Sequence, residues 1–376
     1  MAKLTGKNIA KYARWIVLAL ILGGTMLIHY LHINNSRVML PSVHALCPLG
    51  GLENLWSWIA GNANLQKIFS GTMTLFFFTL VFAFLFGRAF CGNICPFGAL
   101  QEFTGKIAKR KFTVPVKADA VLRFLKYAVL VFVTVMAWVT ASIWISPYDP
   151  YAAFAHIWAG KGLFSETGTG FVILVIVLAV SIFIDRFFCK YLCPAGALYG
   201  IIAKISPAKI RRNACTSCNC SACEQCSKIC PMNVDVSKTD AVKSAECIAC
   251  GQCITACPSQ KNCIRMTVFG KTIKPLIFVI ATVTIFFGSL FVFDRAGMLK
   301  LTVPSIESVR ESGEPLKASE LRGMMTIETG AEYMGMELSD FYVFMEIPET
   351  VPMDTPLRNV GSYVPGWDFH VIRDTR

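Results

Sequence analysis

The chain has 376 residues, of which 54% are hydrophobic and 16% are charged, and its mean hydropathy is +0.53. A soluble protein needs a larger share of charged residues to cover its surface, so the composition predicts a membrane protein. The net charge of +12 is of the sign that nucleic-acid binders carry, but its distribution follows membrane topology, and no nucleic-acid partner is expected.

Five apolar runs have close to the roughly 20 residues that a helix needs to cross a hydrocarbon core of about 30 Å. The runs predicted as membrane helices are 15–33, 69–87, 127–146, 170–187 and 275–293. No small-residue cleavage site follows the first run, so we expect it to be a retained span and not a signal peptide.

Lysine and arginine residues predict the orientation of these spans. The segments predicted to be cytoplasmic hold 25 of them and the segments predicted to be outside hold 11. The two outer loops hold only Arg37, Lys67 and Lys161. Positive residues collect on the cytoplasmic side of a membrane. We therefore expect the chain in the cytoplasmic membrane of a prokaryote, with the N-terminus and the cysteine-rich part on the cytoplasmic side and the C-terminal tail on the extracytoplasmic side.

An internal repeat lies in the first half of the chain. The stretch FGRAFCGNICPFGALQ (86–101) matches IDRFFCKYLCPAGALY (184–199) at an offset of 98 residues, and CPLGGLENLW (47–56) resembles DPYAAFAHIW (149–158). Two copies with the same topology imply a pseudo-twofold axis along the membrane normal. The outer loops, 41–68 and 147–168, are expected to form short amphipathic pieces in the interface.

Each repeat contains a CxxxCP motif just past the inner end of its span. The cysteines are Cys91, Cys95, Cys189 and Cys193. A pair at i and i+4 shares one face of a helix or helical turn, and the repeat would bring the two pairs together. Four converging thiolates suit an iron–sulfur cluster or another tetrathiolate metal. The alternatives are a redox disulfide and small packed thiols.

Eleven of the sixteen cysteines fall between Cys215 and Cys263, and most of them form two C-x2-C-x2-C-x3-C-P runs. This is the spacing of bacterial proteins with two [4Fe–4S] clusters, in which the fourth cysteine of each run binds the other cluster. The predicted ligands are Cys220, Cys223, Cys226 and Cys257 for cluster 1, and Cys247, Cys250, Cys253 and Cys230 for cluster 2. Structural zinc is the disfavoured alternative, because zinc sites rarely show two such runs.

Three cysteines of this region are left over. Cys215 and Cys218 form a further C-x2-C just before the first run, and they are either a third metal site or spare thiols. Cys263 is expected to be a packing thiol.

Polar residues of the outer loops form a further candidate site. His44, Cys47 and His156 are the residues that would hold a quinol, a haem or a metal ion at the outer membrane boundary. The simpler alternative is a pair of hydrogen-bonded interfacial histidines and a packed thiol.

The fold class predicted from these features is an α-helical membrane protein of about five spans with an inserted ferredoxin-like domain. The predicted parts are a four-span repeat core (1–210), a cytoplasmic two-cluster domain (211–270), a fifth span (271–294) and a small helical extracytoplasmic module (295–376).

These motifs resemble those of the polytopic ferredoxin-type membrane proteins of the NapH, NosR and CcoG types. The resemblance covers roughly residues 10–293 and rests on CGNICPFGALQ, CKYLCPAGALYG, the two C-x2-C-x2-C-x3-CP runs and the outer HALCPLGGLE. It implies electron exchange among a quinone, cytoplasmic clusters and an extracytoplasmic redox partner. Cys215, Cys218 and the acidic tail depart from the shared pattern, and no flavin-attachment domain of the NosR type precedes the spans.

The leading functional prediction is a membrane-embedded electron-transfer subunit of a larger oxidoreductase complex. It would exchange electrons with a cytoplasmic ferredoxin or dehydrogenase, which the basic inner face would attract, and with a quinone or an extracytoplasmic enzyme. An assembly or maturation factor for a metalloenzyme and a redox sensor are the alternatives.

Overall fold

We describe the protein from a computed structural model. It describes residues 6–34, 41, 46–60, 70–108, 110–112, 114–140, 142–159, 162–213, 224–257, 263–301, 315, 318, 321, 323, 325–369 and 372. The chain forms two compact units. The larger comprises Met1–Tyr30 and Pro41–Leu301, and the smaller comprises Leu31–Leu40 and Thr302–Arg376.

Three helices in the described part of the chain are long and apolar enough to cross a membrane: α1 (Gly6–Asn34), α7 (Val116–Thr140) and α15 (Pro275–Arg295). The shorter apolar helices include α4 (Ser70–Phe86) and the part of α9 (Gly162–Phe183) that follows its kink at Thr167. All five predicted runs therefore fall on helices, although the number of true spans stays a prediction.

The run predicted at 127–146 is displaced in the structure, because α7 starts at Val116 and ends at Thr140. The helix can begin earlier because its charged residues have partners: Lys126 pairs with Glu246 and Arg123 with Asp119.

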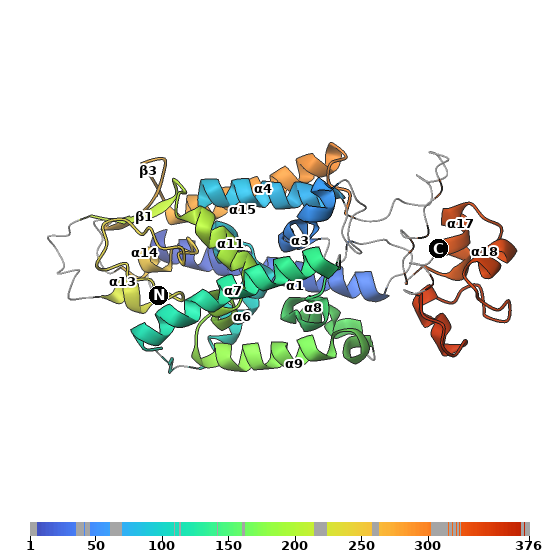
Figure 1. Cartoon of the computed structure of the whole chain (residues 1–376). Helices are drawn as coiled ribbons and strands as arrows, with labels where there is room; N and C mark the ends of the chain where they lie inside the picture. The colour runs from blue at the N-terminus through green and yellow to red at the C-terminus, as the bar shows by residue number, and fades with distance from the viewer. Residues whose placement is uncertain are drawn as a thin grey trace. The chain divides into compact units, whose positions relative to one another are not determined.

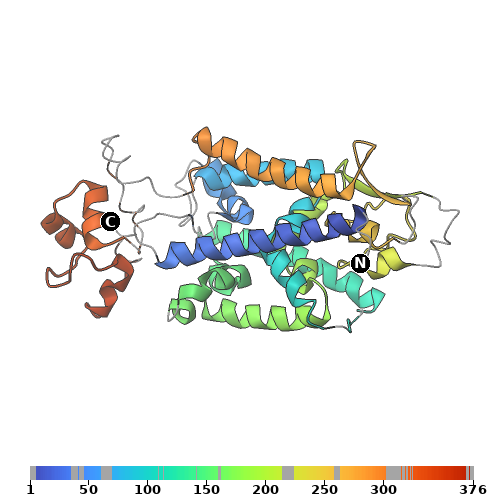
Figure 2. The ribbon, with the colours of Figure 1, turned by 180° about the vertical axis from the view of Figure 1, so that it is seen from behind.

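The long helices of the larger unit alternate in direction. Lys7 near the start of α1 donates to the carbonyl of Cys257, so α1 begins beside the cysteine-rich insert. Arg88 follows α4 and donates to the carbonyl of Ala245, so α4 ends beside the same insert. Figures 1 and 2 show α4 and α15 lying side by side, and they run in opposite directions, since α4 ends and α15 begins at the end that carries the insert.

The structure repeats one pair of short helices after α4 and after α9. The first pair is α5 (Ala89–Asn93) and α6 (Pro96–Thr104), and the second is α10 (Phe187–Tyr191) and α11 (Pro194–Ala203). The outer loops contain α3 (Pro48–Ile59) in the first repeat and η1 (Ser146–Tyr148), α8 (Pro150–Ala155) and η2 (His156–Ala159) in the second. The repeat seen in the sequence therefore corresponds to repeated local structure.

The cysteine-rich insert is a small α+β element. Strands β1 (Lys209–Arg212), β2 (Ile264–Val268) and β3 (Lys271–Ile273) form an antiparallel sheet in the order β1-β2-β3, with Lys209 opposite Thr267 and Met266 opposite Ile273. Two single-turn helices, α13 (Gln225–Lys228) and α14 (Gln252–Thr255), each carry the third cysteine of a motif.

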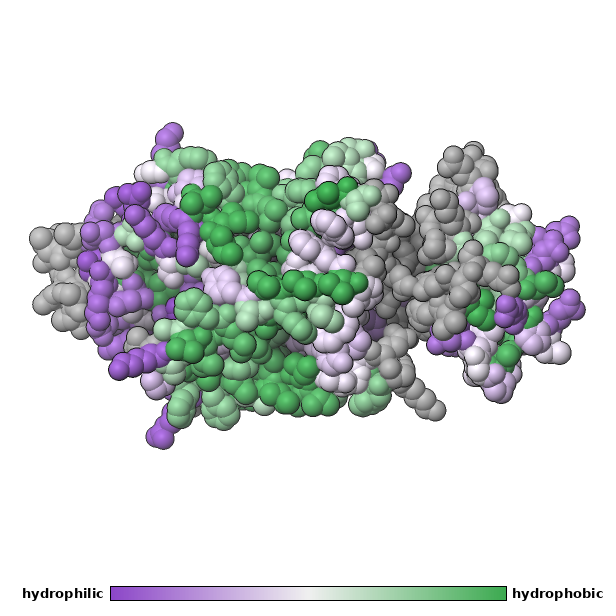
Figure 3. Space-filling view, in the orientation of Figure 1, coloured by the Kyte–Doolittle hydropathy of each residue, from purple (hydrophilic) through white to green (hydrophobic). Residues whose placement is uncertain are grey.

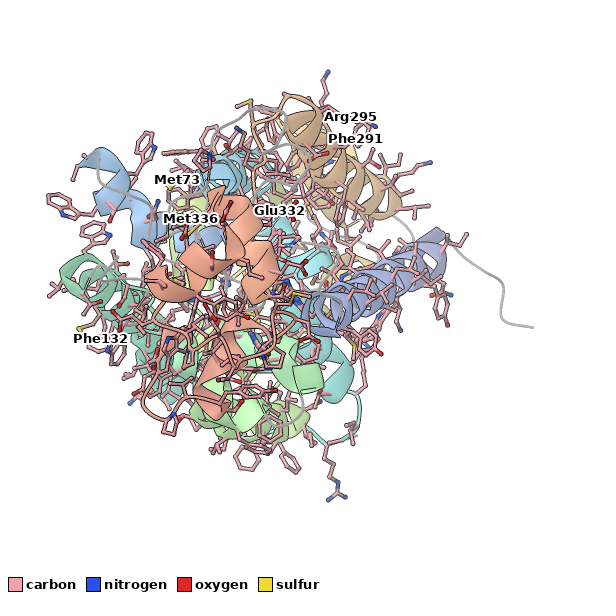
Figure 4. The ribbon with its side chains drawn as sticks, turned by 90° about the vertical axis from the view of Figure 1, so that its right-hand side faces the viewer. Met73, Phe132, Phe291, Arg295, Glu332 and Met336 are labelled. Atoms are coloured by element: carbon pink, nitrogen blue, oxygen red, sulfur yellow. The ribbon has the colours of Figure 1, made fainter. Side chains whose placement is uncertain are left out.

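Apolar side chains cover the outside of the larger unit along its helices. Figure 3 shows this apolar band, with hydrophilic residues gathered at the end that carries β1, α13 and α14. Phe132 on α7 is 51% exposed and points outward, as Figure 4 shows. At the end of α15, Arg295 lies over the ring of Phe291, 5.1 Å from its centroid. An apolar band capped by polar ends is the surface of a membrane protein.

The smaller unit contains α17 (Ile327–Met334), α18 (Leu338–Phe344) and η4 (Leu357–Ser362) around an apolar core. The Thr326 hydroxyl accepts the amide hydrogen of Thr329 and starts α17, and Gly335 ends it with a positive φ of 63°. Because glycine adopts that conformation without strain, the chain turns there and α18 begins as a separate helix.

Candidate metal centres

The CxxxCP motifs adopt the same backbone conformation in both repeats. Cys91 and Cys189 lie within the short helices α5 and α10, whereas Cys95 and Cys193 are the N-cap residues of α6 and α11. The proline that follows each N-cap starts the next helix, where a missing N–H costs nothing. The proline therefore divides each motif between two short helices, with one cysteine in the first and the other at the start of the second.

Hydrogen bonds direct the CxxxCP sulfur atoms toward fixed donors. The amide of Gly98 donates to Cys95 Sγ at 3.4 Å, and the amide of Gly196 donates to Cys193 Sγ at 3.3 Å. Gln101 Nε2 donates to Cys189 Sγ at 3.2 Å. Donors at a helix N-terminus favour a sulfur that carries negative charge.

The four CxxxCP thiols are brought together in the interior. Cys91 and Cys189 are buried, and Cys95 lies close enough to both for their charges to act on it. Burial, followed by the charges of Cys189 and Cys91, raises the pKa of Cys95 to about 12. At neutral pH this thiol therefore keeps its proton, and a metal would have to displace that proton to bind the sulfur.

No group of three or more His, Cys, Asp or Glu side chains converges tightly enough to hold a metal ion anywhere in the described residues. A cubane cluster binds each thiolate through a different iron, so its ligands stand farther apart than those of one ion.

The predicted ligands of cluster 2 surround one cavity. Cys230, Cys247, Cys250 and Cys253 all line it, together with apolar residues that include Ile248 and Met232. The amide of Val234 donates to Cys230 Sγ at 3.4 Å. Four thiols around an apolar space, with a backbone amide directed at a sulfur, fit the chemistry of a [4Fe–4S] cluster.

Only half of the predicted cluster 1 site lies within the described residues. Cys226 and Cys257 are both buried, and their charges interact. Cys220 and Cys223 lie outside the described residues, as do Cys215 and Cys218. Cys263 is buried and disulfide-bonded, so it is not the free packing thiol that the sequence predicted.

Buried charges join the CxxxCP helices to the insert, and sequence reasoning missed them. Glu102 on α6 pairs with Arg14 at 2.7 Å and with Arg186 at 2.5 Å, and it accepts a hydrogen bond of 2.7 Å from Gln252 on α14. Burial alone would raise the pKa of Glu102, but the charges of Arg186 and Arg14 outweigh it and lower the pKa to about 2. The signal in the sequence was an arginine at the same position of each repeat, Arg88 in the first and Arg186 in the second.

A second buried cluster of charges contains Glu246, which immediately precedes Cys247. It pairs with Arg88 at 3.4 Å and with Lys126 on α7. All three side chains are almost completely buried.

The two sites are in direct backbone contact at one glycine. A Cβ on Gly92, in the first CxxxCP motif, would lie 2.1 Å from the carbonyl oxygen of Ile248 and 3.3 Å from the amide nitrogen of Cys250. Only glycine permits so close an approach of two backbones. The cluster-2 loop is therefore packed directly against the first CxxxCP motif.

The outer candidate site is only partly described. Cys47 lies near Asp149, and burial, aided by the charge of Asp149, raises the pKa of Cys47 to about 12. His156 Nδ1 lies 2.8 Å from the carbonyl oxygen of Ala152. His44 lies outside the described residues. A role for these three residues in binding a quinol, haem or metal stays a prediction.

The chain is similar to several known proteins. A family model described as a 4Fe-4S binding domain matches residues 71–115 and 167–213, the two segments that contain the CxxxCP motifs. YccM of Escherichia coli K12, named as an inferred electron transport protein, is 35% identical over 204 residues, which cover 52% of this chain and 56% of YccM.

Two further relatives carry names of ferredoxin-type or regulatory proteins. The ferredoxin-type protein NapH of Escherichia coli K12 is 26% identical over 59% of this chain and 73% of its own length. The regulatory protein NosR of Pseudomonas aeruginosa is 31% identical over 35% of this chain and 18% of its own length. The chain spans between a half and two thirds of the first three relatives, 56%, 57% and 65% of their lengths. No solved structure matches the chain.

Proposed function

Because the chain belongs to the ferredoxin-type 4Fe–4S membrane proteins of the NapH and NosR kind, we propose that it passes electrons between a cytoplasmic partner and a carrier in or beyond the membrane. The cytoplasmic partner is a reduced ferredoxin or a dehydrogenase. The carrier is a quinone or an extracytoplasmic redox enzyme with which this chain forms a complex.

The observation that carries this proposal is the contact between Gly92 and the cluster-2 loop, with a carbonyl oxygen only 2.1 Å from where a Cβ would stand. A soluble ferredoxin needs no such contact with membrane helices. Two [4Fe–4S] clusters, bound by the eight cysteines of the insert, would each supply one-electron oxidation and reduction. The four CxxxCP cysteines would hold the next station toward the membrane, which a cytoplasmic cluster needs because the hydrocarbon core is about 30 Å thick.

The residues of the chain contribute position and charge to this function. Cys95 and Cys193 begin the helices that carry Gly98 and Gly196, whose amides donate to their sulfurs. The apolar lining of the cluster-2 cavity excludes water. Glu102 and Glu246 hold the cations that connect the insert to the repeat helices.

The proposal is tested with a variant in which Cys91, Cys95, Cys189 and Cys193 are all replaced by serine. Serine is a good N-cap residue, so α6 and α11 keep their starts. We expect the variant purified without oxygen to keep about eight irons per chain, and the wild-type protein to hold about twelve if the CxxxCP cysteines bind a third [4Fe–4S] cluster.

Electron transfer is then measured in proteoliposomes, from a reduced ferredoxin outside the vesicles to a quinone in the bilayer. The quadruple variant should keep the low-temperature electron paramagnetic resonance (EPR) spectrum of the insert, which is the internal control, and lose quinone reduction. Quinone reduction at the wild-type rate would show that the CxxxCP cysteines are not a station. Fewer than eight irons in the wild-type protein would contradict the two-cluster assignment.

A further inference from the structure

Two arginines occupy matching positions in the internal repeat and are both completely buried. Arg88 precedes α5 and Arg186 precedes α10, and their exposed fractions are 1% and 0%. Each side chain crosses to the CxxxCP helix of the other repeat. A Cβ on Gly196 would lie 2.7 Å from Arg88 Nη2, and a Cβ on Gly98 would lie 2.9 Å from Arg186 Nη1.

The two glycines leave room for these guanidinium groups. Gly98 and Gly196 are also the residues whose amides donate to Cys95 and Cys193. The guanidinium groups therefore lie against the same turn of helix that begins at a CxxxCP sulfur. Arg186 in addition donates through Nη1 to the carbonyl of Cys91 at 2.7 Å.

The same arginines reach the insert on their other side. Arg88 Nη1 donates to the carbonyl of Ala245 at 3.0 Å and pairs with Glu246, the two residues that precede Cys247. The charge of Arg88 interacts with Cys91 and Cys193, and it also acts on Cys247. Arg88 therefore lies between the CxxxCP thiols and a ligand of the cluster-2 site.

Arg186 stands in the equivalent place on the other side of the repeat. Its charge interacts with Cys189 of the second CxxxCP motif and with Cys250 of the cluster-2 site. Its carboxylate partner, Glu102, accepts a hydrogen bond from Gln252, which lies between Cys250 and Cys253. The internal repeat thus places one arginine between the two thiol sets on each side.

The buried ion pairs leave positive charge uncompensated. Glu102 faces two cations, Arg14 and Arg186, and Glu246 faces two others, Arg88 and Lys126. Each carboxylate can neutralise one of its two cations. Arg88 Nε and Nη2 are buried without a hydrogen-bond partner. A buried cation without a counter-charge is strongly destabilising, and the neighbouring thiols supply that counter-charge once a bound metal or cluster has displaced their protons.

We propose that Arg88 and Arg186 are positioning residues for electron transfer, each sharing its positive charge between the cluster-2 site and the CxxxCP site. The inference rests on the proposed function, since it takes both thiol sets to be redox centres. One electron, delivered by a reduced carrier of the ferredoxin class, moves from the cluster-2 site to the CxxxCP site, and no bond forms or breaks. The positive charge stabilises the reduced form of whichever site holds the electron.

The test is the midpoint potential of the cluster-2 EPR signal in redox titrations of Arg88→Gln and Arg186→Gln. We expect each variant to shift it to more negative values by at least about 59 mV, which is a tenfold loss in the equilibrium constant for one-electron reduction. Arg88→Lys and Arg186→Lys keep the charge and should recover most of the shift.

Lys126→Gln is the matched control. It removes a completely buried cation from the same carboxylate, Glu246, but the groups that act most strongly on Lys126 are Arg88, Glu246 and Arg123, none of them a thiol. We expect a loss of stability with a shift in potential below a third of that of Arg88→Gln. Equal shifts in Lys126→Gln and Arg88→Gln would overturn the proposal. Unchanged midpoint potentials in Arg88→Gln and Arg186→Gln would overturn it as well.

Two further variants decide the matter if the Gln variants fail to assemble the cluster. Gly98→Ala and Gly196→Ala keep every charge but displace a guanidinium, because their Cβ atoms would lie within 3 Å of it. A shifted potential supports the proposal and an unchanged one overturns it. The potential of the insert is measured whether or not the quinone is reduced, so this result is independent of the proteoliposome assay.

Discussion

Buried carboxyl groups at the two ends of the larger unit have opposite surroundings. Glu102, beside the insert, is held between two arginines. Glu53 on α3 and Asp149 before α8 lie in the outer loops, and neither forms an ion pair with a Lys or Arg among the described residues. Burial, followed by the charge of Asp149, raises the pKa of Glu53 to about 8, and burial raises that of Asp149 to about 6.

The raised pKa of Glu53 predicts a pH-dependent stability. In the folded protein this carboxyl keeps its proton up to about pH 8, whereas in the unfolded chain it loses it near pH 4.3. The folded state therefore binds more protons between these values, and stability falls as the pH rises through this window. We expect the melting temperature of the protein in detergent to fall from pH 5 to pH 8.

Glu53→Gln should remove that part of the pH dependence, because the amide cannot ionise. Asp149→Asn is the companion variant: it removes the titration of Asp149 near pH 6 and also lowers the pKa of Glu53, because the charge of Asp149 contributes to raising it. A melting temperature that depends on pH to the same extent in Glu53→Gln and the wild-type protein would contradict the prediction.

At the scale of elements, the repeated helices are connected to the insert by Glu246 and to each other by Glu102. Glu246 lies in the segment that leads to Cys247, and its partners belong to α7 and to the end of α4. Ion pairs of this kind are costly to break because a cation is left buried without its partner. The surface pair between Lys111 and Asp185 is a natural contrast, since its side chains are 29% and 42% exposed.

Replacing Glu246 by glutamine should therefore lower the free energy of unfolding by about 3–5 kcal/mol, because two buried cations lose their carboxylate. Asp185→Asn also removes one carboxylate from an ion pair, but it should cost less than about 1 kcal/mol. Chemical denaturation in detergent measures both values. Equal effects of the two variants would mean that the Glu246 pairs do not hold the insert.

At the scale of the whole molecule, the five-span topology stays a prediction, because three of the described helices are long and apolar enough to cross a membrane. The helix α4 contains only 17 residues and the apolar part of α9 also 17, which is the lower limit for a membrane crossing. The helix α4 nevertheless ends beside the insert, and α1 begins beside it.

The topology can be tested with epitope tags inserted after two exposed residues, Lys106 beyond α6 and Tyr148 before α8. If α4 and α9 both cross the membrane, the tag after Lys106 is cytoplasmic and the tag after Tyr148 is extracytoplasmic. If only α1, α7 and α15 cross, the two locations are exchanged. Antibody access in spheroplasts, with and without permeabilisation, distinguishes the two arrangements.

Local patterns in the sequence determined much of this architecture. Apolar length predicted the positions of the long helices, because a segment that crosses hydrocarbon must be apolar and helical throughout. The spacing of the cysteines in the insert predicted that Cys230, Cys247, Cys250 and Cys253 would share a site, and these four line one cavity. The quoted repeat predicted the paired helices α5–α6 and α10–α11.

Other features depended on contacts between segments far apart in the chain. The burial of Lys126 on α7 depends on Glu246, 120 residues further along the chain, and no local pattern contains that partner. Burial and the nearest charge set the pKa of Glu53 and of Glu102, which as isolated residues are alike. The sequence by itself determined which residue types each site receives and how they are spaced. Only the tertiary structure decided that Gly92 touches the cluster-2 loop and that Arg88 and Arg186 lie between the two thiol sets, because desolvation and pairing depend on what packs around a side chain.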